Sequence, residues 1–211
     1  MKSFKELVEG KHFFRLRLTD ERFVNLYAMF HNFVDPVGTN PDGDPKWIFA
    51  SRKHHQGQEV NNEPDAVTIV PIRSDGDSLK VVMTREFRYP IMDYEWSFPA
   101  GLIDKGESIE VAAARELKEE TGLKMEKVIE ETPACYSSAG ITDECSPILF
   151  ALASGEISTK GNDKGEIIEV VPVEFGDIKE LLQDRTKKFS ARAWLILRII
   201  LGGLNLPNVK R

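Results

Sequence analysis

The stretch GLIDKGESIEVAAARELKEETGL, residues 101–123, decides the fold of this chain. Its second half predicts a helix over residues 108–121, because Ser108 is a good N-cap and Gly122 suits the left-handed backbone that follows a last helical turn. At about 100° per residue, four apolar side chains of this helix share one arc that faces the core. They are Ile109, Ala112, Ala113 and Leu117.

Three glutamates interrupt this apolar arc. Glu116 and Glu120 fall in its middle and Glu119 falls at its edge. Carboxylates at i and i+4 repel each other, and burying them without a partner is costly. The one arginine nearby, Arg115, is outnumbered by the three acids. A divalent cation is the remaining candidate, and oxygen ligands suit Mg²⁺ or Mn²⁺; a solvated acidic face is the alternative.

The same stretch has the spacing of a known motif. It reads Gly, five residues, Glu, seven residues, then Arg-Glu-aliphatic-any-Glu-Glu-any-Gly-aliphatic, and every specified position matches. This resembles the Nudix box. The resemblance implies an α+β Nudix fold, in which a mixed β-sheet is sandwiched between helices. It also implies that a nucleoside diphosphate linked to another moiety is hydrolysed with Mg²⁺ or Mn²⁺.

The resemblance also assigns roles to single residues. It implies that Glu116, Glu119 and Glu120 are metal ligands, with Glu119 and Glu120 counted among the catalytic groups, and that the backbone carbonyl of Ala100 is a further ligand. Four other residues of the motif are expected to be structural. Glu107 and Arg115 would pair to hold the loop against the helix, and Gly101 and Gly122 would serve the backbone geometry.

A general base is expected from a later loop. The passage DKGEIIEV, residues 163–170, resembles the Gly-Glu-aliphatic-any-Glu-Val segment of ADP-sugar pyrophosphatases. We therefore expect Glu166 to be the base, with Asp163 in reserve. Glu169 is a weaker candidate because it lies within a predicted strand.

Two passages bear on the substrate. Residues 82–101 resemble segments of ADP-ribose and ADP-sugar pyrophosphatases, which implies that Arg88 contacts phosphate. Residues 35–52 resemble the N-terminal passage of that subfamily, in which Trp47 would stack on adenine with Arg52 nearby; the alternative is a tryptophan packed within a small sheet. Those relatives exchange N-terminal sheets in a homodimer. The chain departs from them at Ala139, where those relatives often have a proline. The sequence therefore does not decide which nucleotide sugar is the substrate.

Composition excludes several other classes of protein. The chain has 211 residues and a net charge of −6, which argues against a nucleic-acid binder. Its two cysteines, Cys135 and Cys145, fit neither a disulfide scaffold nor a metal site, so we expect free thiols in the cytoplasm. The longest apolar run, residues 193–201, contains Arg198 and is too short for a membrane span.

The rest of the chain predicts an α+β protein in two parts. Residues 1–60 are expected to form a small antiparallel β-sheet, with strands near residues 13–18, 23–34 and 47–50, that serves dimerisation and substrate binding. Residues 61–211 are expected to form the main domain. Its strands are predicted at residues 66–72, 79–84, 94–98, 148–153 and 167–173, and its later helices at 177–184 and 190–202.

The function expected from the sequence is hydrolysis of ADP-ribose or an ADP-sugar to AMP and a sugar phosphate. One alternative is another substrate, such as NADH, coenzyme A or a dinucleoside polyphosphate. Another is a non-catalytic module that binds ADP-ribose. Such a module is expected to lack some of the acidic ligands, and here all of them are present.

Overall fold

The computed structural model describes residues 12–32, 47–53, 63–76, 78–161 and 167–202. The chain divides into two compact units. The first contains residues 1–65 together with 134–146, and the second contains residues 66–133 and 147–211. Residues 134–146, which the sequence places within the main domain, thus group with the N-terminal part.

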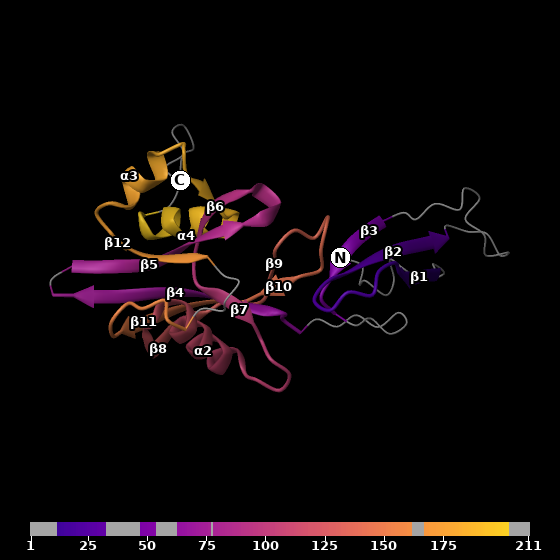
Figure 1. The fold of residues 1–211 in the computed structure, drawn as a ribbon, viewed down its shortest axis with the longest axis horizontal. Coiled ribbons are helices and arrows are strands. Elements are labelled where there is room, and N and C mark those ends of the chain that lie inside the picture. The colour runs from indigo at the N-terminus through magenta and orange to yellow at the C-terminus, as the bar shows by residue number, and fades with distance from the viewer. Residues whose placement is uncertain (1–11, 33–46, 54–62, 77, 162–166, 203–211) are drawn as a thin grey trace, which may run out of the picture. The chain divides into compact units, whose positions relative to one another are not determined.

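The first unit contains the predicted small antiparallel sheet (Figure 1). Its strands are β1 (His12–Arg17), β2 (Asn25–Asn32) and β3 (Trp47–Ser51), in that order. Tyr27 of β2 lies opposite Phe49 of β3 and stacks on it, with ring centroids 5.7 Å apart. A second, two-stranded ladder joins β9 (Cys135–Tyr136) to β10 (Cys145–Ser146), which the sequence did not predict.

The second unit is built on an eight-stranded mixed sheet, in which β4 pairs with β11, and β13 with β6, in parallel. The order along the sheet is β13-β6-β5-β4-β11-β8, with β12 beside β5 and β7 beside β4. The strands are β4 (Ala66–Asp75), β5 (Ser78–Arg88), β6 (Asp93–Ser97), β7 (Ala100–Leu102), β8 (Lys124–Glu131), β11 (Ile148–Ser154), β12 (Ile168–Glu174) and β13 (Lys188–Phe189).

Helices cover both faces of this sheet (Figure 1). On one face, α2 (Ile109–Thr121) packs on Val67, Ile69 and Leu149. On the other, α3 (Ile178–Gln183) and α4 (Ala191–Ile200) pack on Val70, Val81 and Met83. A short 3₁₀ turn, η1 (Tyr89–Ile91), links β5 to β6. Alternate residues of a strand thus pack into two different hydrophobic cores, one on each face of the sheet. The predicted α+β class, with a mixed sheet sandwiched between helices, is confirmed.

Two strands of this sheet differ from the sequence-based expectation. The sequence predicts one strand at residues 94–98 and none directly after it, but Ala100–Leu102 form β7, which pairs with the start of β4. β8 was not predicted. It is an edge strand of mostly charged residues, and its pairing with β11 has two irregularities, so the alternation that marks a strand is weak there.

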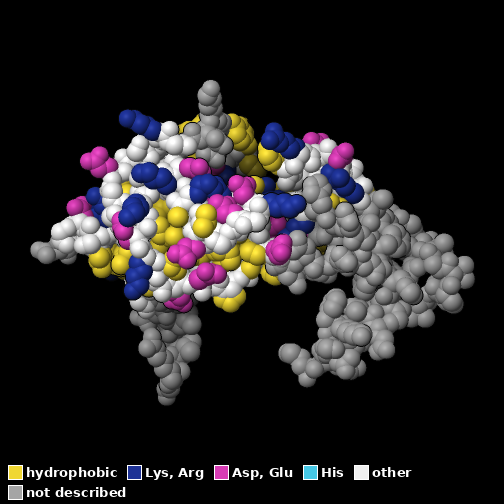
Figure 2. All heavy atoms as spheres, turned by 90° about the horizontal axis from the view of Figure 1, so that it is seen from below, with side chains coloured by type: hydrophobic (Ala, Val, Ile, Leu, Met, Phe, Trp, Pro, Cys, Tyr) yellow, Lys and Arg dark blue, Asp and Glu magenta, His cyan; other side chains and the backbone are white. Residues whose placement is uncertain are grey.

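On the face seen in Figure 2, basic and acidic side chains of the second unit are interspersed and form no patch of one sign. Such a surface agrees with the modest net charge of −6. Among the described residues, no helix is long and apolar enough to cross a membrane.

Candidate active site

Helix α2 begins and ends where its sequence predicts. The Ser108 hydroxyl accepts a hydrogen bond from the Val111 backbone N–H at 3.3 Å, which caps the first turn. Gly122 follows the last turn with φ at 74°, in the left-handed region that glycine adopts at little cost. These two ends fix the rotation of α2 and therefore the direction of its side chains.

The acidic residues of α2 lie as the helical phase predicts. Glu120 is only 7% exposed, beside the fully buried Leu117. The Glu116 side chain is 14% exposed, whereas that of Glu119 is 48% exposed. Two carboxylates thus lie on the inward face of an otherwise apolar helix surface, and a third lies at its edge. Inward carboxylates cost folding free energy, so this arrangement points to a functional role.

Gly101 of β7 makes room for one of these carboxylates. A Cβ atom built on Gly101 would lie 1.9 Å from the carboxyl carbon of Glu116, far inside any real contact. Glu116 therefore lies directly over the backbone of β7, next to Ala100. Any side chain at residue 101 would displace the Glu116 carboxylate, which explains the glycine at this position.

Arg115 lies at the centre of a cluster of carboxylates. Its guanidinium donates to Glu107 at 2.9 Å, to Glu116 at 2.6 Å and to Glu119 at 3.2 Å. It also donates to the Leu102 carbonyl oxygen at 2.9 Å. The structure therefore brings Glu107 and Arg115 together, and one cation pairs with three carboxylates, two of them on α2. The buried Glu120 is a further acid of α2.

The pairing of Arg115 with Glu107 also affects their protonation. Hydrogen bonds from Arg115, and one from the Asp104 backbone N–H, hold the pKa of the Glu107 carboxyl below its ordinary value. Glu107 in turn raises the pKa of Arg115 further above its already high value. Both groups stay charged near neutral pH, so the ion pair holds the loop before α2 against the helix.

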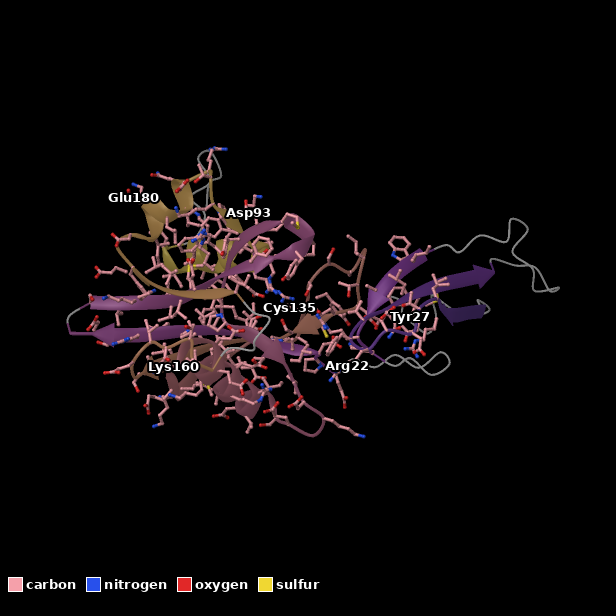
Figure 3. All side chains as sticks on the ribbon, viewed as in Figure 1. Arg22, Tyr27, Asp93, Cys135, Lys160 and Glu180 are labelled. Carbon is pink, nitrogen blue, oxygen red and sulfur yellow. The ribbon has the colours of Figure 1, made fainter. Side chains whose placement is uncertain are left out.

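A later segment packs closely against the end of α2. The Ser158 backbone N–H donates to the Thr121 carbonyl oxygen at 2.8 Å. A Cβ atom on Gly161 would lie 2.6 Å from the backbone oxygen of Glu119. Lys160, labelled in Figure 3, belongs to the same segment. The chain that leads toward the predicted base is thus fixed to the turn that carries Glu119.

The donor set on α2 fits a hard divalent cation. Its groups are carboxylate oxygens on one helix face, next to a backbone strand whose glycine leaves space for them. Within the described part of the chain, no three His, Cys, Asp or Glu side chains are yet arranged around a single point. Instead, the carboxylates of Glu116 and Glu119 both pair with the Arg115 guanidinium.

The predicted base Glu166 and its reserve Asp163 lie outside the described residues. The residues that flank them are described: Gly161 contacts α2, and the Ile167 carbonyl oxygen accepts a hydrogen bond from the Phe87 backbone N–H at 3.1 Å. Glu169, the weaker candidate, lies on β12, where its carboxylate accepts a hydrogen bond from Arg85 at 2.8 Å.

The predicted phosphate contact, Arg88, is the last residue of β5. Its half-exposed guanidinium forms ion pairs with Glu86 at 2.9 Å and Glu95 at 3.6 Å. Because Phe87 contacts Ile167, Arg88 lies at the end of the sheet where the segment with the predicted base enters β12.

Trp47 lines a pocket of about 240 Å³ in the first unit. Its indole N–H donates to the Gly140 carbonyl oxygen at 3.0 Å, and the residue remains 55% exposed. Tyr136, which is 54% exposed, lines the same pocket. The complete lining is Met29, Trp47, Phe49, Tyr136, Ala139, Thr142 and Asp143. Sequence reasoning missed Tyr136 and Asp143, because only the folded chain brings residues 136–143 to β3.

Arg52 follows β3 in the same unit. Its Nε donates to the Glu144 carboxylate at 2.6 Å, and the Ser137 hydroxyl donates to the other oxygen of that carboxylate at 3.1 Å. Arg52 therefore fixes the segment that forms one wall of the Trp47 pocket.

The main unit is a mixed β-sheet with helices on both faces, and one of these helices, α2, carries a cluster of acidic residues. These features are those of the Nudix fold that the sequence predicts. The sequence matches the NUDIX domain over residues 62–195. The chain belongs to the Nudix family.

Similar proteins extend this comparison. The chain is 35% identical over 127 residues to putative nudix hydrolase 2 of Caenorhabditis elegans, which covers 57% of this chain and 56% of that protein. It is 33% identical over 129 residues to ADP-ribose pyrophosphatase of Bacillus subtilis, covering 61% of this chain and 68% of that protein. A crystal structure of an ADP compounds hydrolase has a similar fold, with a TM-score of 0.60, 22% identity and 89% of each chain covered.

Proposed function

We propose that this Nudix protein is a pyrophosphohydrolase that cleaves the diphosphate of ADP-ribose or a related ADP-sugar, giving AMP and a sugar phosphate. The observation that carries this proposal is the inward placement of Glu116 and Glu120 on α2, with Glu116 over Gly101. The similarity to the ADP-ribose pyrophosphatase of Bacillus subtilis supports the substrate class.

Mg²⁺ or Mn²⁺ is the proposed cofactor. Glu116, Glu119, Glu120 and the carbonyl oxygen of Ala100 would hold it. When bound, such a cation neutralises diphosphate oxygens and lowers the pKa of a bound water. The site keeps a surplus of negative charge for this task, because one guanidinium cannot balance the three carboxylates that pair with it, and α2 carries the buried Glu120 as well.

Arg115 has a positioning role in this proposal. Its hydrogen bonds to Glu107 and to the Leu102 carbonyl oxygen tie the loop, β7 and α2 together. A cation that binds Glu116 would compete with Arg115 for that carboxylate, while the contact to Glu107 remains. The guanidinium would then keep the loop in place without neutralising the site.

Glu166 is the proposed general base that takes a proton from the attacking water. Its support is the placement of its flanking residues: Gly161 lies against Glu119, and Ile167 lies beside Phe87. Glu169 is less suited to this role because it is already paired with Arg85 on β12.

Arg88 is the proposed phosphate contact. A guanidinium presents two parallel N–H groups that match two phosphate oxygens. Arg88 is half-exposed and now pairs with two carboxylates, so a phosphate can replace them without burying a new charge.

The Trp47 pocket is the proposed nucleobase site. Trp47 offers a large exposed ring, and its hydrogen bond to Gly140 holds that ring in place. Ring faces of this kind stack on nucleobases with a typical gain of about 1–3 kcal/mol. Arg52 supports the pocket through Glu144.

We also propose a homodimer in the cytoplasm, with residues 1–60 serving dimerisation. Several apolar side chains on or beside β2 and β3 are exposed, as expected of a surface that is covered by a second copy. They are Phe23, Val24, Leu26 and Ile48. The cysteines are free, with Cys135 exposed and Cys145 buried, which fits a reducing compartment. Light scattering after size exclusion measures the assembly directly.

A hydrolysis screen tests the proposed activity. The full chain is incubated with ADP-ribose, ADP-sugars, NADH, coenzyme A and dinucleoside polyphosphates, each with Mg²⁺, Mn²⁺ or EDTA, and the products are identified by mass spectrometry. We expect AMP and a sugar phosphate from ADP-ribose or an ADP-sugar, and none in EDTA. Binding of ADP-ribose without any product would instead indicate a non-catalytic module.

A further inference from the structure

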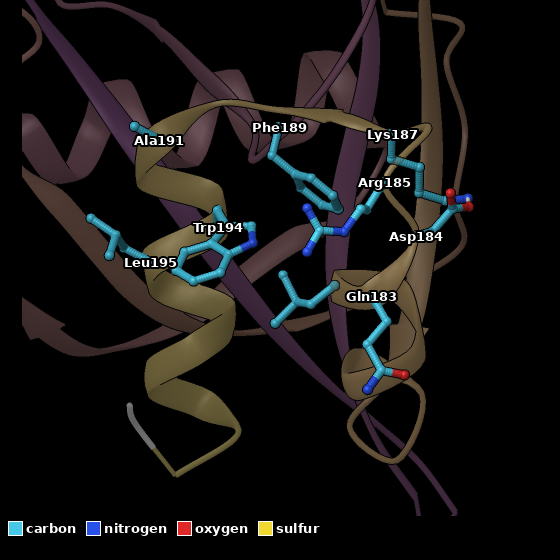
Figure 4. A pocket seen from close by; sticks show the side chains of 9 residues that line it. Gln183, Asp184, Arg185, Lys187, Phe189, Ala191, Trp194 and Leu195 are labelled. Carbon is cyan, nitrogen blue, oxygen red and sulfur yellow. Dashed lines mark hydrogen bonds and ion pairs between the residues drawn. The ribbon is translucent and has the colours of Figure 1, made fainter. Parts of the chain in front are cut away.

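The second unit has a large cleft on the face of the sheet opposite to α2. Its volume is about 770 Å³, within the usual range for small-molecule sites. It lies between α3 and α4 and the turn that joins α3 to β13 (Figure 4). The lining residues are Leu182, Gln183, Asp184, Arg185, Lys187, Phe189, Ala191, Trp194 and Leu195. None of them belongs to the candidate active site.

Two aromatic rings form walls of this cleft. Trp194 projects from α4 and Phe189 from β13, and both rings border the open space (Figure 4). Phe189 packs against Trp96 of the sheet, with ring centroids 6.1 Å apart, so its position is fixed by the core. Such rings offer flat apolar surfaces to a planar ligand.

Arg185 supplies a positive charge between these rings. Its guanidinium points from the turn toward Trp194, beneath the ring of Phe189 (Figure 4). Among the described residues, no carboxylate lies within ion-pairing distance of Arg185, although the cleft contains an acid. A guanidinium that projects into a cleft without an acid partner can bind an anion in the cleft.

The acid of the cleft, Asp184, is already engaged by other groups. Lys187 donates to one of its oxygens at 2.5 Å, and the Thr186 backbone N–H and hydroxyl donate to the other at 2.9 Å and 2.6 Å. The hydrogen bond from Lys187, followed by those from Thr186, holds the pKa of Asp184 far below its usual value. Asp184 and Lys187 neutralise each other, which leaves the charge of Arg185 unbalanced in the cleft.

We propose that this cleft is a second binding site, for a small planar aromatic anion such as a nucleoside monophosphate. The ring of the ligand would stack on Trp194, and the phosphate of the ligand would accept two parallel hydrogen bonds from the Arg185 guanidinium. Because α2 packs on the other face of the sheet, this site is separate from the candidate active site. The proposal does not depend on the function proposed above.

AMP is a suitable probe, and the indole signals of the full-length protein in ¹H–¹⁵N NMR spectra are a suitable readout. The chain has three tryptophans, Trp47, Trp96 and Trp194, so each signal can be assigned with a single Trp→Phe variant. We expect AMP, titrated in EDTA, to shift the Trp194 signal in a saturable manner. Any AMP that binds in the nucleobase pocket moves the Trp47 signal instead, so the two sites are read separately.

Two partial ligands and two variants make the test specific. Adenosine has the ring without the anion and ribose 5-phosphate has the anion without the ring, and each is expected to bind at least about tenfold more weakly than AMP. Arg185→Ala should weaken AMP binding at Trp194 about tenfold, the loss expected for one charge-assisted contact. Lys179→Ala removes the same charge from an exposed position of α3 outside the cleft and should bind AMP like the wild type.

Three results would overturn the proposal. The first is a Trp194 signal that does not move in millimolar AMP. The second is equal AMP binding by wild type and Arg185→Ala, with both proteins folded by the dispersion of their spectra. The third is a Trp194 signal that changes with protein concentration but not with AMP, which would identify the cleft as a contact between copies of the chain.

Discussion

Helices α2 and α4 pack on opposite faces of one sheet and begin in the same way, yet they bury different side chains. Each starts at a serine whose hydroxyl accepts a backbone hydrogen bond, from Val111 in α2 and from Ala193 in α4. Helix α4 buries only apolar residues, Ala193, Ile196 and Leu197. Helix α2 buries Glu120 as well. The buried face of α4 thus contributes to stability alone, whereas that of α2 gives up some stability because it carries a carboxylate.

The largest effect is expected from Glu120→Gln. The variant keeps the shape of the side chain and removes its charge, so hydrolysis should fall about a hundredfold or more, as for loss of a metal contact. The thermal midpoint should stay equal or rise, because a buried charge and an i,i+4 repulsion are removed. Steady-state kinetics with saturating Mg²⁺ and a melting curve measure both effects. The control is Glu110→Gln, an exposed glutamate of the same helix, and full activity of Glu120→Gln would refute the ligand assignment.

The counterpart on α4 is Leu197→Ala. This fully buried leucine fills the core on the other face of the sheet, so its truncation should cost about 2–5 kcal/mol of unfolding free energy. Below the unfolding transition, kcat should remain close to that of the wild type. Urea denaturation and kinetics on the same sample provide the comparison. A large loss of kcat in protein that is still folded would show that α4 also serves catalysis.

A smaller effect on activity is expected from Gly161→Ala. The new Cβ would lie 2.6 Å from the Glu119 backbone oxygen, so the segment before the predicted base must move away from α2. Displacement of a catalytic group by about 1 Å can lower kcat by about tenfold to a hundredfold. The matched control is Gly176→Ala, where nothing lies within 4 Å of the added atom. Equal kcat for both variants would mean that the contact does not position the base.

The smallest effect concerns the pH dependence of stability. The folded-state pKa of Glu107 is lowered, chiefly by hydrogen bonds from Arg115, so its contribution to stability is complete above the unfolded pKa of about 4.3. That contribution is lost as the pH falls through the lower, folded-state pKa. Wild type should therefore exceed Glu107→Gln in melting temperature at pH 6, and the difference should shrink toward pH 3. A difference that does not change with pH would contradict this account.

The phase of α2 could be predicted from the sequence because it depends on local spacing. Caps, apolar residues and glutamates within one helix fix which side chains face inward, and the structure shows Glu116 and Glu120 there. The small N-terminal sheet was predictable for a similar reason, since its strands alternate or are rich in aromatic and β-branched residues.

Features that depend on distant parts of the chain could not be predicted. Strand β8 is an edge strand that is mostly exposed, so its sequence carries little apolar pattern. Tyr136 and Asp143 line the Trp47 pocket only because residues 134–146 group with the first unit.

The grouping of residues 134–146 with the first unit has a consequence for how the protein is made. This segment connects β8 to β11, two neighbouring antiparallel strands of the main sheet, and is bounded by Pro133 and Pro147. Because the ribosome delivers the chain in the order of its sequence, the first unit stays unfinished until residue 146 has emerged. A fragment that ends at residue 65 therefore lacks part of its own unit, and a continuous piece of the gene that contains the Trp47 pocket must also contain β4 to β8 of the second unit.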